Sequence, residues 1–522
     1  MNHTPTAYDT VEYPSSPLPQ THPSRLGAIA RLHGLAAAPP SACRILEVGC
    51  GDGANLLPLA LAYPASTFIG IDLSVTAIAR GEAVRTRLGL SNLELRTADI
   101  MDGTPPGDGF DYIIAHGFYS WVPAFVRDAL FAVCRERLRP AGLAYVSYNA
   151  LPGCHVRRML ADMLKFHVRG IADPREKIEQ AGAFLQFLAQ GVTGTGPYSD
   201  LLREEVRQVA DEKARAVLFH DDLADINDPV TITDFVAHAS QFGLRFLAEA
   251  DYYEMTGDLF PPSAAAVLRD LAATDTVKKE QYLDFLRLRR FRQTILCRAD
   301  ALVRAERDPE AIRDFAVCGA PVPEPLPADL TAGIRVKFRS GSGAIMTVDH
   351  PLAKAALILV GERSPHSITV PALLAAVRKR TGVSTDDDAE MLERLLLSAY
   401  RIGMVDLQWD APRYVTAAGP LPRLSPLARI QLESGEELIS SLRHSVVRVD
   451  NPVTRELLLL LDGTRDAASV LSGLSERAAA DPSFAAPGDP PRSAQWWRET
   501  LAPQIDAGIA MAATTAMLVE EN

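Results

Sequence analysis

The sequence predicts an α/β protein built around a doubly wound parallel sheet. Apolar runs and helical patterns alternate five times over residues 43–149, which is typical of consecutive βαβ units. The first apolar run, Arg44–Val48, ends in a stretch with glycine at positions 49, 51 and 53. A second run ends in Asp72. Ligands of such sheets bind at the carboxyl ends of the strands, so we expect the functional residues there.

Five strands and three helices follow from the pattern. The expected strands are Arg44–Val48, the run that ends at Asp72, Leu93–Thr97, Phe110–Ala115 and 143–149, and the expected helices are 55–62, Val75–Leu88 and 123–138. Gly89 is a typical stop signal for the second helix. Pro123 suits the first turn of the third helix, where no backbone donor is needed.

The glycine-rich turn and the acid after the second strand predict a nucleoside-cofactor site. Glycine allows backbone angles and close approaches that a Cβ would prevent, and the Asp72 carboxylate suits the two hydroxyl donors of a ribose. The spacing is GxGxG after Glu47, whereas most dinucleotide sites have GxGxxG, so NAD is the weaker alternative. The stretch resembles the first motif of class I S-adenosylmethionine (SAM) dependent methyltransferases, E-x-G-x-G-x-G, which implies SAM.

The methyltransferase resemblance implies two further strands and a set of cofactor contacts. A class I sheet has seven strands with the last one antiparallel, and the β-like runs 244–250 and 291–297 are the candidates. Residues 154–240 are then a helical insertion over the site; the alternative is a separate helical domain over 154–300. The expected cofactor-binding residues are Glu47, Gly49, Gly51, Gly53, Asn55, Asp72, Leu73, Asp99, Ile100 and His116. In the family, Asp99 would contact the adenine amino group and Ile100 would pack on the ring.

Aromatic and polar residues after the fourth and fifth strands are the candidates for the acceptor side. Methyl transfer is an in-line displacement that needs an aligned nucleophile and exclusion of water, and it requires no metal. The expected catalytic residues are His116, Tyr119, Tyr148 and Asn149. Their rings suit an ammonium group through cation–π attraction, about 0.5–2 kcal/mol per contact, but the same rings could simply pack the sheet. Imidazole titrates near neutrality, so His116 could accept a proton or be a structural histidine.

The N-terminal arm precedes the cofactor strand and is rich in proline, serine and threonine. It is either a lid over the cofactor, as in many methyltransferases, or a plain disordered tail. The expected substrate-binding residues are Tyr8, Tyr13, His22, Trp121 and His155.

The C-terminal third predicts two small modules. The proline-rich stretch 320–330 has the composition of a linker. Residues 331–416 and 420–522 each have the pattern of a winged-helix-like α+β module. The predicted third helix of the first module carries acids at 386, 387, 388, 390 and 393. Phosphate repulsion makes nucleic acid an unsuitable partner, so we expect protein contacts instead.

Composition is that of a soluble globular protein. The 522 residues are 47% hydrophobic and carry a net charge of −12, which gives no field to attract nucleic acid or an anionic membrane. Six cysteines without a CxxC pair indicate neither a zinc site nor a disulfide framework. No secretory signal and no apolar run of about 18 residues is evident, so membrane insertion is not expected and a cytoplasmic location is.

A narrower resemblance depends on the strings TADI, FDYIIAHGFYSWVP and LAYVSYNALPGCH. They resemble the bacterial protein-lysine methyltransferases that carry a methyltransferase regulatory domain, over about residues 7–300. The best-known members methylate lysines of a large outer-membrane surface protein. The family often has tryptophan where this chain has Cys154, which leaves open whether the acceptor pocket is changed.

The combined reading is a Rossmann-like methyltransferase with a helical insertion and C-terminal winged-helix-like modules. The expected divisions are 1–153 (core and arm), 154–240 (helical cap), 241–319 (last strands and regulatory-domain helices), 331–416 and 420–522. We expect transfer of a methyl group from SAM to a protein lysine amine. The alternatives are a small molecule or peptide natural product as acceptor, and a SAM-binding regulatory protein without catalysis.

Overall fold

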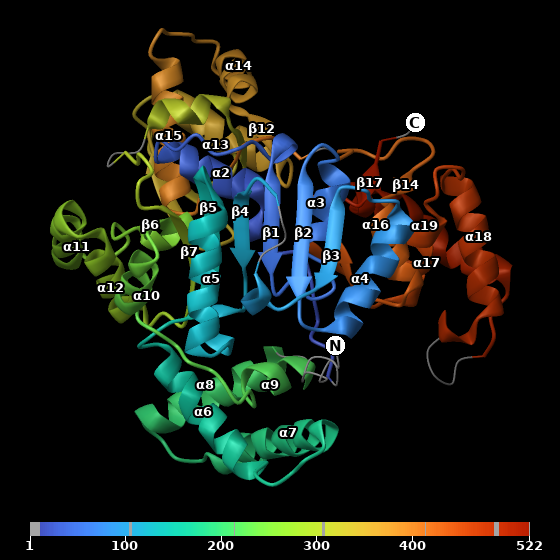
Figure 1. Ribbon diagram of the computed structural model, residues 1–522. Helices are drawn as coiled ribbons and strands as arrows, with labels where there is room; N and C mark the ends of the chain where they lie inside the picture. The colour runs from blue at the N-terminus through green and yellow to red at the C-terminus, as the bar shows by residue number, and fades with distance from the viewer. Residues whose placement is uncertain are drawn as a thin grey trace.

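A seven-stranded sheet forms the centre of the computed structural model (Figure 1). The structure describes residues 11–520 except 104–106, 213–214, 305–307, 413 and 485–489. The strands are β1 (Arg44–Val48), β2 (Thr67–Asp72), β3 (Leu93–Thr97), β4 (Phe110–Ala115), β5 (Leu138–Asn149), β6 (Leu244–Glu249) and β7 (Phe291–Arg298). Their order is β3-β2-β1-β4-β5-β7-β6, and β7 is antiparallel to both neighbours. The predicted seven-stranded methyltransferase sheet is therefore confirmed.

Strand β5 begins earlier than the expected residue 143. Its pairing with β4 starts at Phe110 with Leu138 and resumes at Tyr112 with Leu143, so residues 139–142 form an irregular excursion within the strand. Pro140 falls in this excursion, where no regular ladder bond is required of it.

Helices cover both faces of the sheet. One face carries α2 (Pro23–Leu32), α3 (Leu56–Ala62) and α4 (Val75–Leu88), and the other carries α5 (Ala124–Arg137) and α10 (Ile232–Gln241). Alternate residues of β4 show the division, because Tyr112 joins the first core and Ile113 the second. Figure 1 shows α5 in front of the sheet.

Four helices between β5 and α10 lie beyond the carboxyl ends of the strands (Figure 1). They are α6 (Cys154–His167), α7 (Pro174–Gly191), α8 (Pro197–Glu212) and α9 (Arg215–Asp221). They form a separate hydrophobic cluster that includes Leu160, Leu185 and Val206.

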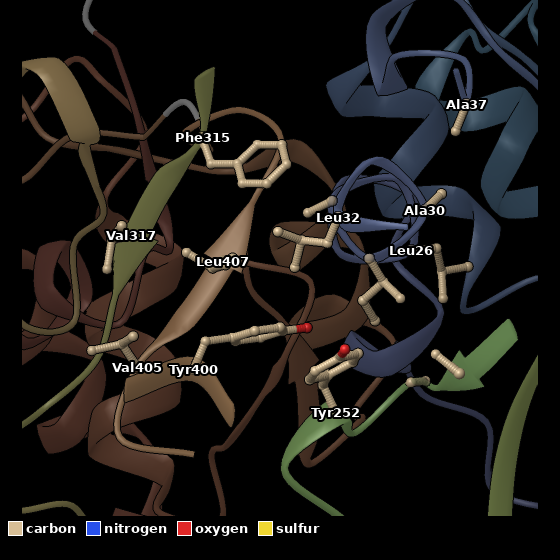
Figure 2. Packing of buried hydrophobic residues seen from close by; sticks show 14 of the residues in the cluster. Leu26, Ala30, Leu32, Ala37, Tyr252, Phe315, Val317, Tyr400, Val405 and Leu407 are labelled. Carbon is tan, nitrogen blue, oxygen red and sulfur yellow. The ribbon is translucent and has the colours of Figure 1, made fainter. Parts of the chain in front are cut away.

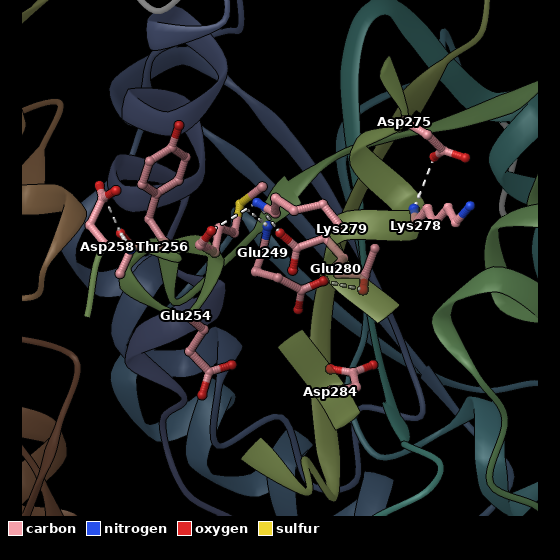
Figure 3. A network of polar contacts seen from close by, with 12 residues as sticks. Glu249, Glu254, Thr256, Asp258, Asp275, Lys278, Lys279, Glu280 and Asp284 are labelled. Carbon is pink, nitrogen blue, oxygen red and sulfur yellow. Dashed lines mark hydrogen bonds and ion pairs between the residues drawn. The ribbon is translucent and has the colours of Figure 1, made fainter. Parts of the chain in front are cut away.

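A buried ionic network joins the antiparallel edge of the sheet to α12 (Thr276–Arg287), the helix that follows α11 (Pro262–Thr274). The Arg292 guanidinium on β7 is fully buried and lies 2.6 Å from a Glu249 oxygen and 2.8 Å from an Asp284 oxygen. Glu280 approaches it at 3.2 Å and also pairs with Lys279 at 2.6 Å. Figure 3 shows Glu249 and Glu280 converging from β6 and α12.

The middle module packs directly on α2. Its elements are β8 (Ala316–Cys318), β9 (Val322–Glu324), β10 (Val336–Arg339), β11 (Ile345–Val348), α13 (Pro351–Arg363), β12 (Ile368–Thr369), α14 (Val370–Thr381), α15 (Asp388–Arg401) and β13 (Asp406–Gln408). Figure 2 shows Leu32 on the side of Phe315 and Leu407, all in one buried cluster. Tyr252 and Tyr400 stack with centroids 5.1 Å apart. The expected linker 320–330 contains β9, which pairs with β10, so a part of it belongs to the module.

The C-terminal module has its own core, with Leu458, Leu474 and Ile505 among the buried residues. Its elements are β14 (Arg423–Leu424), α16 (Pro426–Glu433), β15 (Leu438–Ser440), β16 (Val446–Arg448), α17 (Pro452–Leu460), α18 (Ala467–Ala480), α19 (Ala494–Thr514) and β17 (Leu518–Val519). An ion pair between Arg87 of α4 and Glu433 of α16 connects it to the sheet domain.

Short 3-10 turns complete the chain. They are η1 (Pro19–Thr21), η2 (Pro40–Ala42), η3 (Ile100–Asp102), η4 (Tyr119–Trp121), η5 (Tyr252–Met255), η6 (Pro309–Asp314) and η7 (Pro482–Phe484). Among the described helices, none combines the length and the apolar character that crossing a membrane demands.

Replacing Gly81 by alanine should destabilise the fold. Gly81 lies in α4 against the glycine-rich turn, and a Cβ there would lie 2.1 Å from the Asp52 carbonyl oxygen. Backbone would have to move, so we expect Gly81→Ala to lower the free energy of unfolding by about 1–3 kcal/mol. Thermal and urea unfolding measure this.

Gly182 in α7 is the matched control, because a Cβ there meets nothing within 4 Å. Gly182→Ala should be neutral or stabilising by up to about 1 kcal/mol through helix propensity. Equal stability of the two variants would contradict the close packing of α4 on the turn.

Candidate active site

The glycine-rich turn after β1 is held by the acid at the end of β2. Gly49, Gly51 and Gly53 have φ of 73°, 56° and 75°, backbone that favours glycine. Asp72 accepts hydrogen bonds from the Gly51 N–H and the Ser74 N–H, both at 2.8 Å. The glycine-rich turn and Asp72, the residue predicted to bind the ribose, therefore form one unit at the carboxyl edge of the sheet.

Glu47, at the end of β1, is buried and only half satisfied. Asn55 Nδ2 donates to its Oε1 at 3.0 Å, whereas Oε2 is buried and has no hydrogen-bond partner among the described residues. Burial raises the pKa of Glu47 to about 8. An unpaired buried oxygen is costly, so a ligand that brings a donor to Oε2 would be stabilised here.

Asn55 connects three parts of the chain at the cofactor turn. Its Oδ1 accepts hydrogen bonds from the Leu18 N–H at 2.9 Å and from His444 Nε2 at 2.8 Å. Its Nδ2 approaches Thr21 Oγ1 at 3.1 Å in addition to Glu47. The arm and the C-terminal module thus meet on one side-chain amide.

The predicted adenine contacts lie after β3. Asp99 accepts a hydrogen bond from the Met101 N–H at 2.9 Å and so caps η3. Ile100 is buried, and Leu73, after β2, is exposed. All three lie at the carboxyl edge of the sheet, and their contacts with the cofactor stay a prediction.

The described part of the arm, from Val11, runs between the cofactor turn and α9. His220 Nε2 of α9 bonds the Val11 carbonyl at 2.7 Å, and the Tyr13 ring meets the His220 ring edge-on at 5.5 Å. Ser15 Oγ would be 3.1 Å from a Cβ on Gly51. Tyr8 lies outside the described residues. The described part of the arm therefore lies over the glycine-rich turn.

His22 caps α2 and, within the described part of the chain, makes no hydrogen bond to the strand-end residues. Its Nδ1 accepts from the Ser24 N–H at 3.1 Å, and its ring meets the His444 ring edge-on at 5.2 Å. Burial lowers the pKa of His22 to about 3. A substrate contact through His22 is not supported by this placement.

A row of hydrogen-bonded polar side chains lies on the face of the sheet covered by α2. This polar row consists of His116, Tyr145, Gln293 and Asp251. Tyr145 OH donates to Gln293 Oε1 at 2.8 Å, so its oxygen accepts from His116 Nδ1 at 3.0 Å. A neutral imidazole carries one N–H. Because Nδ1 carries it here, His116 Nε2 is unprotonated and can accept a hydrogen bond. Burial lowers the pKa of His116 to about 4, which keeps this ring neutral at physiological pH.

The row ends in a carboxylate. Gln293 Nε2 donates to Asp251 Oδ2 at 3.0 Å, and this anion dictates which end of the Gln293 amide faces Tyr145. Asp251 also pairs with Arg25 at 3.4 Å, and Arg25 pairs with Asp406 of the middle module at 3.4 Å. Burial raises the pKa of Asp251, although Arg25 opposes the effect.

Tyr119 and Tyr148 lie in the core on the opposite face, under α5 and α10. Tyr148 is 1% exposed and stacks on Phe235 at 4.0 Å. Tyr119 is 3% exposed, and its hydroxyl bonds His238 Nδ1 at 2.8 Å. This burial favours the alternative that both rings pack the sheet, and their catalytic role stays a prediction.

The remaining predicted residues are spread along the same edge. Asn149 Nδ2 donates to Asn227 Oδ1 at 2.9 Å, Trp121 is partly exposed in η4, and His155 is exposed on α6. Cys154 donates its thiol to the Arg290 carbonyl at 2.9 Å, and burial raises its pKa to about 11. The thiol therefore ties the start of α6 to the residue just before β7.

Sequence reasoning missed Tyr145, Gln293, Asp251 and His444. Asp251 lies just after β6 and Asp72 is the last residue of β2, so the rule that acids at strand ends form sites would have found Asp251. Tyr145 and Gln293 lie inside strands, and His444 lies in a distant turn, where no local pattern marks them.

Three family models match the chain. A methyltransferase domain matches residues 45–142, a predicted methyltransferase regulatory domain matches 214–298, and the PKMT C-terminal winged helix domain matches 421–517. The three matches lie on the strand-end site, on the insertion and sheet edge, and on the module that carries His444.

Relatives and solved structures extend the likeness. Uncharacterized protein RP789 of Rickettsia prowazekii (strain Madrid E) is 36% identical over 324 residues, 62% of this chain and 58% of that protein. Uncharacterized protein RP028 of the same strain is 34% identical over 46% of this chain and 96% of that protein. PKMT2 from Rickettsia typhi, solved alone and in complex with AdoHcy, matches 97% of this chain and 100% of that chain at TM-score 0.84, with 25% and 26% identity.

Removing the Asp72 carboxylate should weaken cofactor binding. Asp72→Ala removes the acceptor for the Gly51 N–H and, with it, the predicted acceptor for the ribose hydroxyls. A charged hydrogen bond is worth about 1.5–3 kcal/mol. We expect the SAM dissociation constant, measured by calorimetry, to rise by well over tenfold. Unchanged affinity in a folded variant would contradict the assignment.

Proposed function

The chain belongs to the class I SAM-dependent methyltransferases of the PKMT type, and we propose that its acceptor is a lysine side-chain amine of a protein. The observation that carries the proposal is the agreement with PKMT2 over 97% of the chain at TM-score 0.84. This likeness includes the middle and C-terminal modules, which a small-molecule methyltransferase core does not need.

The cofactor-side residues fit SAM. The positive-φ glycines allow close approach of the turn to the ligand, and the unpaired Glu47 Oε2 offers an acceptor for a ligand N–H. In our assignment, Asp72 holds the ribose hydroxyls and Asp99 the adenine amino group. Bound SAM supplies an electrophilic methyl group on a sulfonium centre.

We assign the acceptor amine to the His116 end of the polar row. Only a neutral amine has the lone pair that attacks, so one ammonium proton must first pass to water. His116 Nε2 then accepts one amine N–H and directs the lone pair towards the methyl carbon. The N–C bond forms as the C–S bond breaks, and the product ammonium loses its proton to water, because a ring with a pKa of about 4 does not hold it.

The surroundings of the row suit a cationic side chain in a dry site. Asp251 places a carboxylate at the same strand edge, which attracts the incoming ammonium. The arm lies over the cofactor turn, and helices α6–α9 lie beyond the strand ends (Figure 1). Exclusion of water strengthens each electrostatic contact inside.

Incubation with methyl-labelled SAM and lysine-rich protein fractions tests the acceptor. We expect label in protein, recovered after acid hydrolysis as Nε-methyllysine, and no label in a fraction whose lysines were first acetylated. The Asp72→Ala variant is the negative control for enzyme-dependent transfer. Label confined to small molecules, or to another amino acid, would overturn the lysine proposal.

The polar row predicts a specific loss in Asp251→Asn. An asparagine can present either end to Gln293, so the tautomer of His116 is no longer dictated. We expect kcat/KM for the lysine acceptor to fall about tenfold, roughly 1.4 kcal/mol, with the SAM dissociation constant unchanged.

Asp406→Asn is the matched control, since Asp406 pairs with the same Arg25 at the same 3.4 Å, whereas Gln293 donates to Asp251. It should keep kcat/KM within about twofold. An equal loss in both variants would show that Arg25, and not the row, matters.

A further inference from the structure

His444, a buried side chain of the C-terminal module, reaches the cofactor turn. This residue lies in the turn between β15 and β16, which is closed by the Ser441 N–H on the Ser445 carbonyl at 2.8 Å. His444 is 3% exposed and has a φ of +56°, a left-handed backbone that is uncommon for a residue with a side chain. The module therefore holds an imidazole at a sterically disfavoured position, turned inward.

The contact between His444 and Asn55 has a defined direction. Asn55 Oδ1 already accepts the Leu18 N–H, so this oxygen is an acceptor and His444 Nε2 must donate to it at 2.8 Å. Burial lowers the pKa of His444 well below its usual value, so the ring is neutral. Its single proton lies on Nε2, consistent with Nδ1, which is buried without a hydrogen-bond partner in the described part of the chain.

Fixing one end of the Asn55 amide fixes the other. With Oδ1 held by His444, Nδ2 faces Glu47 Oε1 at 3.0 Å and Thr21 Oγ1 at 3.1 Å. A reversed amide would set its oxygen against the Glu47 carboxyl and leave the Leu18 N–H without an acceptor. The imidazole and the Leu18 N–H together hold the amide in the orientation that presents Glu47 and Thr21 to a ligand.

We propose that His444 is a positioning residue for the cofactor, so that the C-terminal module completes the SAM site of the sheet domain. It acts through Asn55 on Glu47 and on the arm residues Leu18 and Thr21. The module is anchored independently by the Arg87–Glu433 ion pair between α4 and α16. The role concerns SAM affinity and is the same whatever the acceptor is.

Two substitutions in the full-length chain test the role. His444→Phe keeps a ring but loses the donor, and we expect the SAM dissociation constant and the KM for SAM to rise about tenfold, with kcat at saturating SAM within threefold. His444→Gln places an amide N–H at a similar reach and should restore affinity to within threefold of the parent. Glu433→Gln, which breaks only the outer ion pair, should leave SAM affinity within twofold.

A third substitution of His444 separates loss of the hydrogen bond from strain in the backbone. His444→Asn tolerates the left-handed backbone but is too short to reach Asn55, so it should bind SAM as weakly as His444→Phe. Unchanged SAM affinity in either variant would overturn the proposal. The proposal would also be overturned if His444→Gln bound SAM as weakly as His444→Phe. Failure of both His444→Phe and His444→Asn to fold would overturn it too, because His444 would then serve the docking of the module in general.

Discussion

The buried Arg292 guanidinium is the interaction on which the geometry of the acceptor side depends. It draws Glu249 from β6 and Asp284 from α12 to within 3 Å, and losing one partner of such a group costs several kcal/mol. Glu249 in turn accepts the Gln293 N–H at 3.1 Å and the Thr294 hydroxyl at 2.8 Å. Two residues after Glu249 the chain presents Asp251. The same cation that attaches the regulatory-domain helices to the sheet edge therefore sets the register of the polar row.

The sheet, the glycine turn and Asp72 could be predicted from sequence because each depends on local pattern and on the rule that parallel strands end at one edge. Side-chain direction was harder. Tyr148 was correctly placed at the end of β5, but its alternation with Tyr145 puts it on the α10 face and Tyr145 on the α2 face. The alternation of side chains along β5 predicts that Tyr145 and Tyr148 lie on opposite faces. It does not say which face is covered by α2 and which by α10. Asp251 and His444 depend on packing between segments far apart in sequence, which no local pattern encodes.

Charge within the middle module also differs from the sequence view. The acids at and just before α15 predict repulsion of phosphate. Asp388 pairs with Arg378 at 2.9 Å and is buried, and Glu393 is buried against Arg313. These carboxylates are neutralised inside the module, so repulsion from this helix is weaker than expected, and the case for protein contacts rests on the likeness to PKMT proteins instead.

The Asn55–His444 bond spans 389 residues of sequence, which has a consequence for synthesis. At about 5–20 residues per second, a ribosome needs roughly 20–80 s to travel from one residue to the other. During that interval the sheet domain can fold around the emerging chain, but its cofactor turn lacks the imidazole that orients it. Truncated or stalled products would carry the whole sheet and an unfinished site, so full affinity for the methyl donor would mark a chain that has been translated past His444.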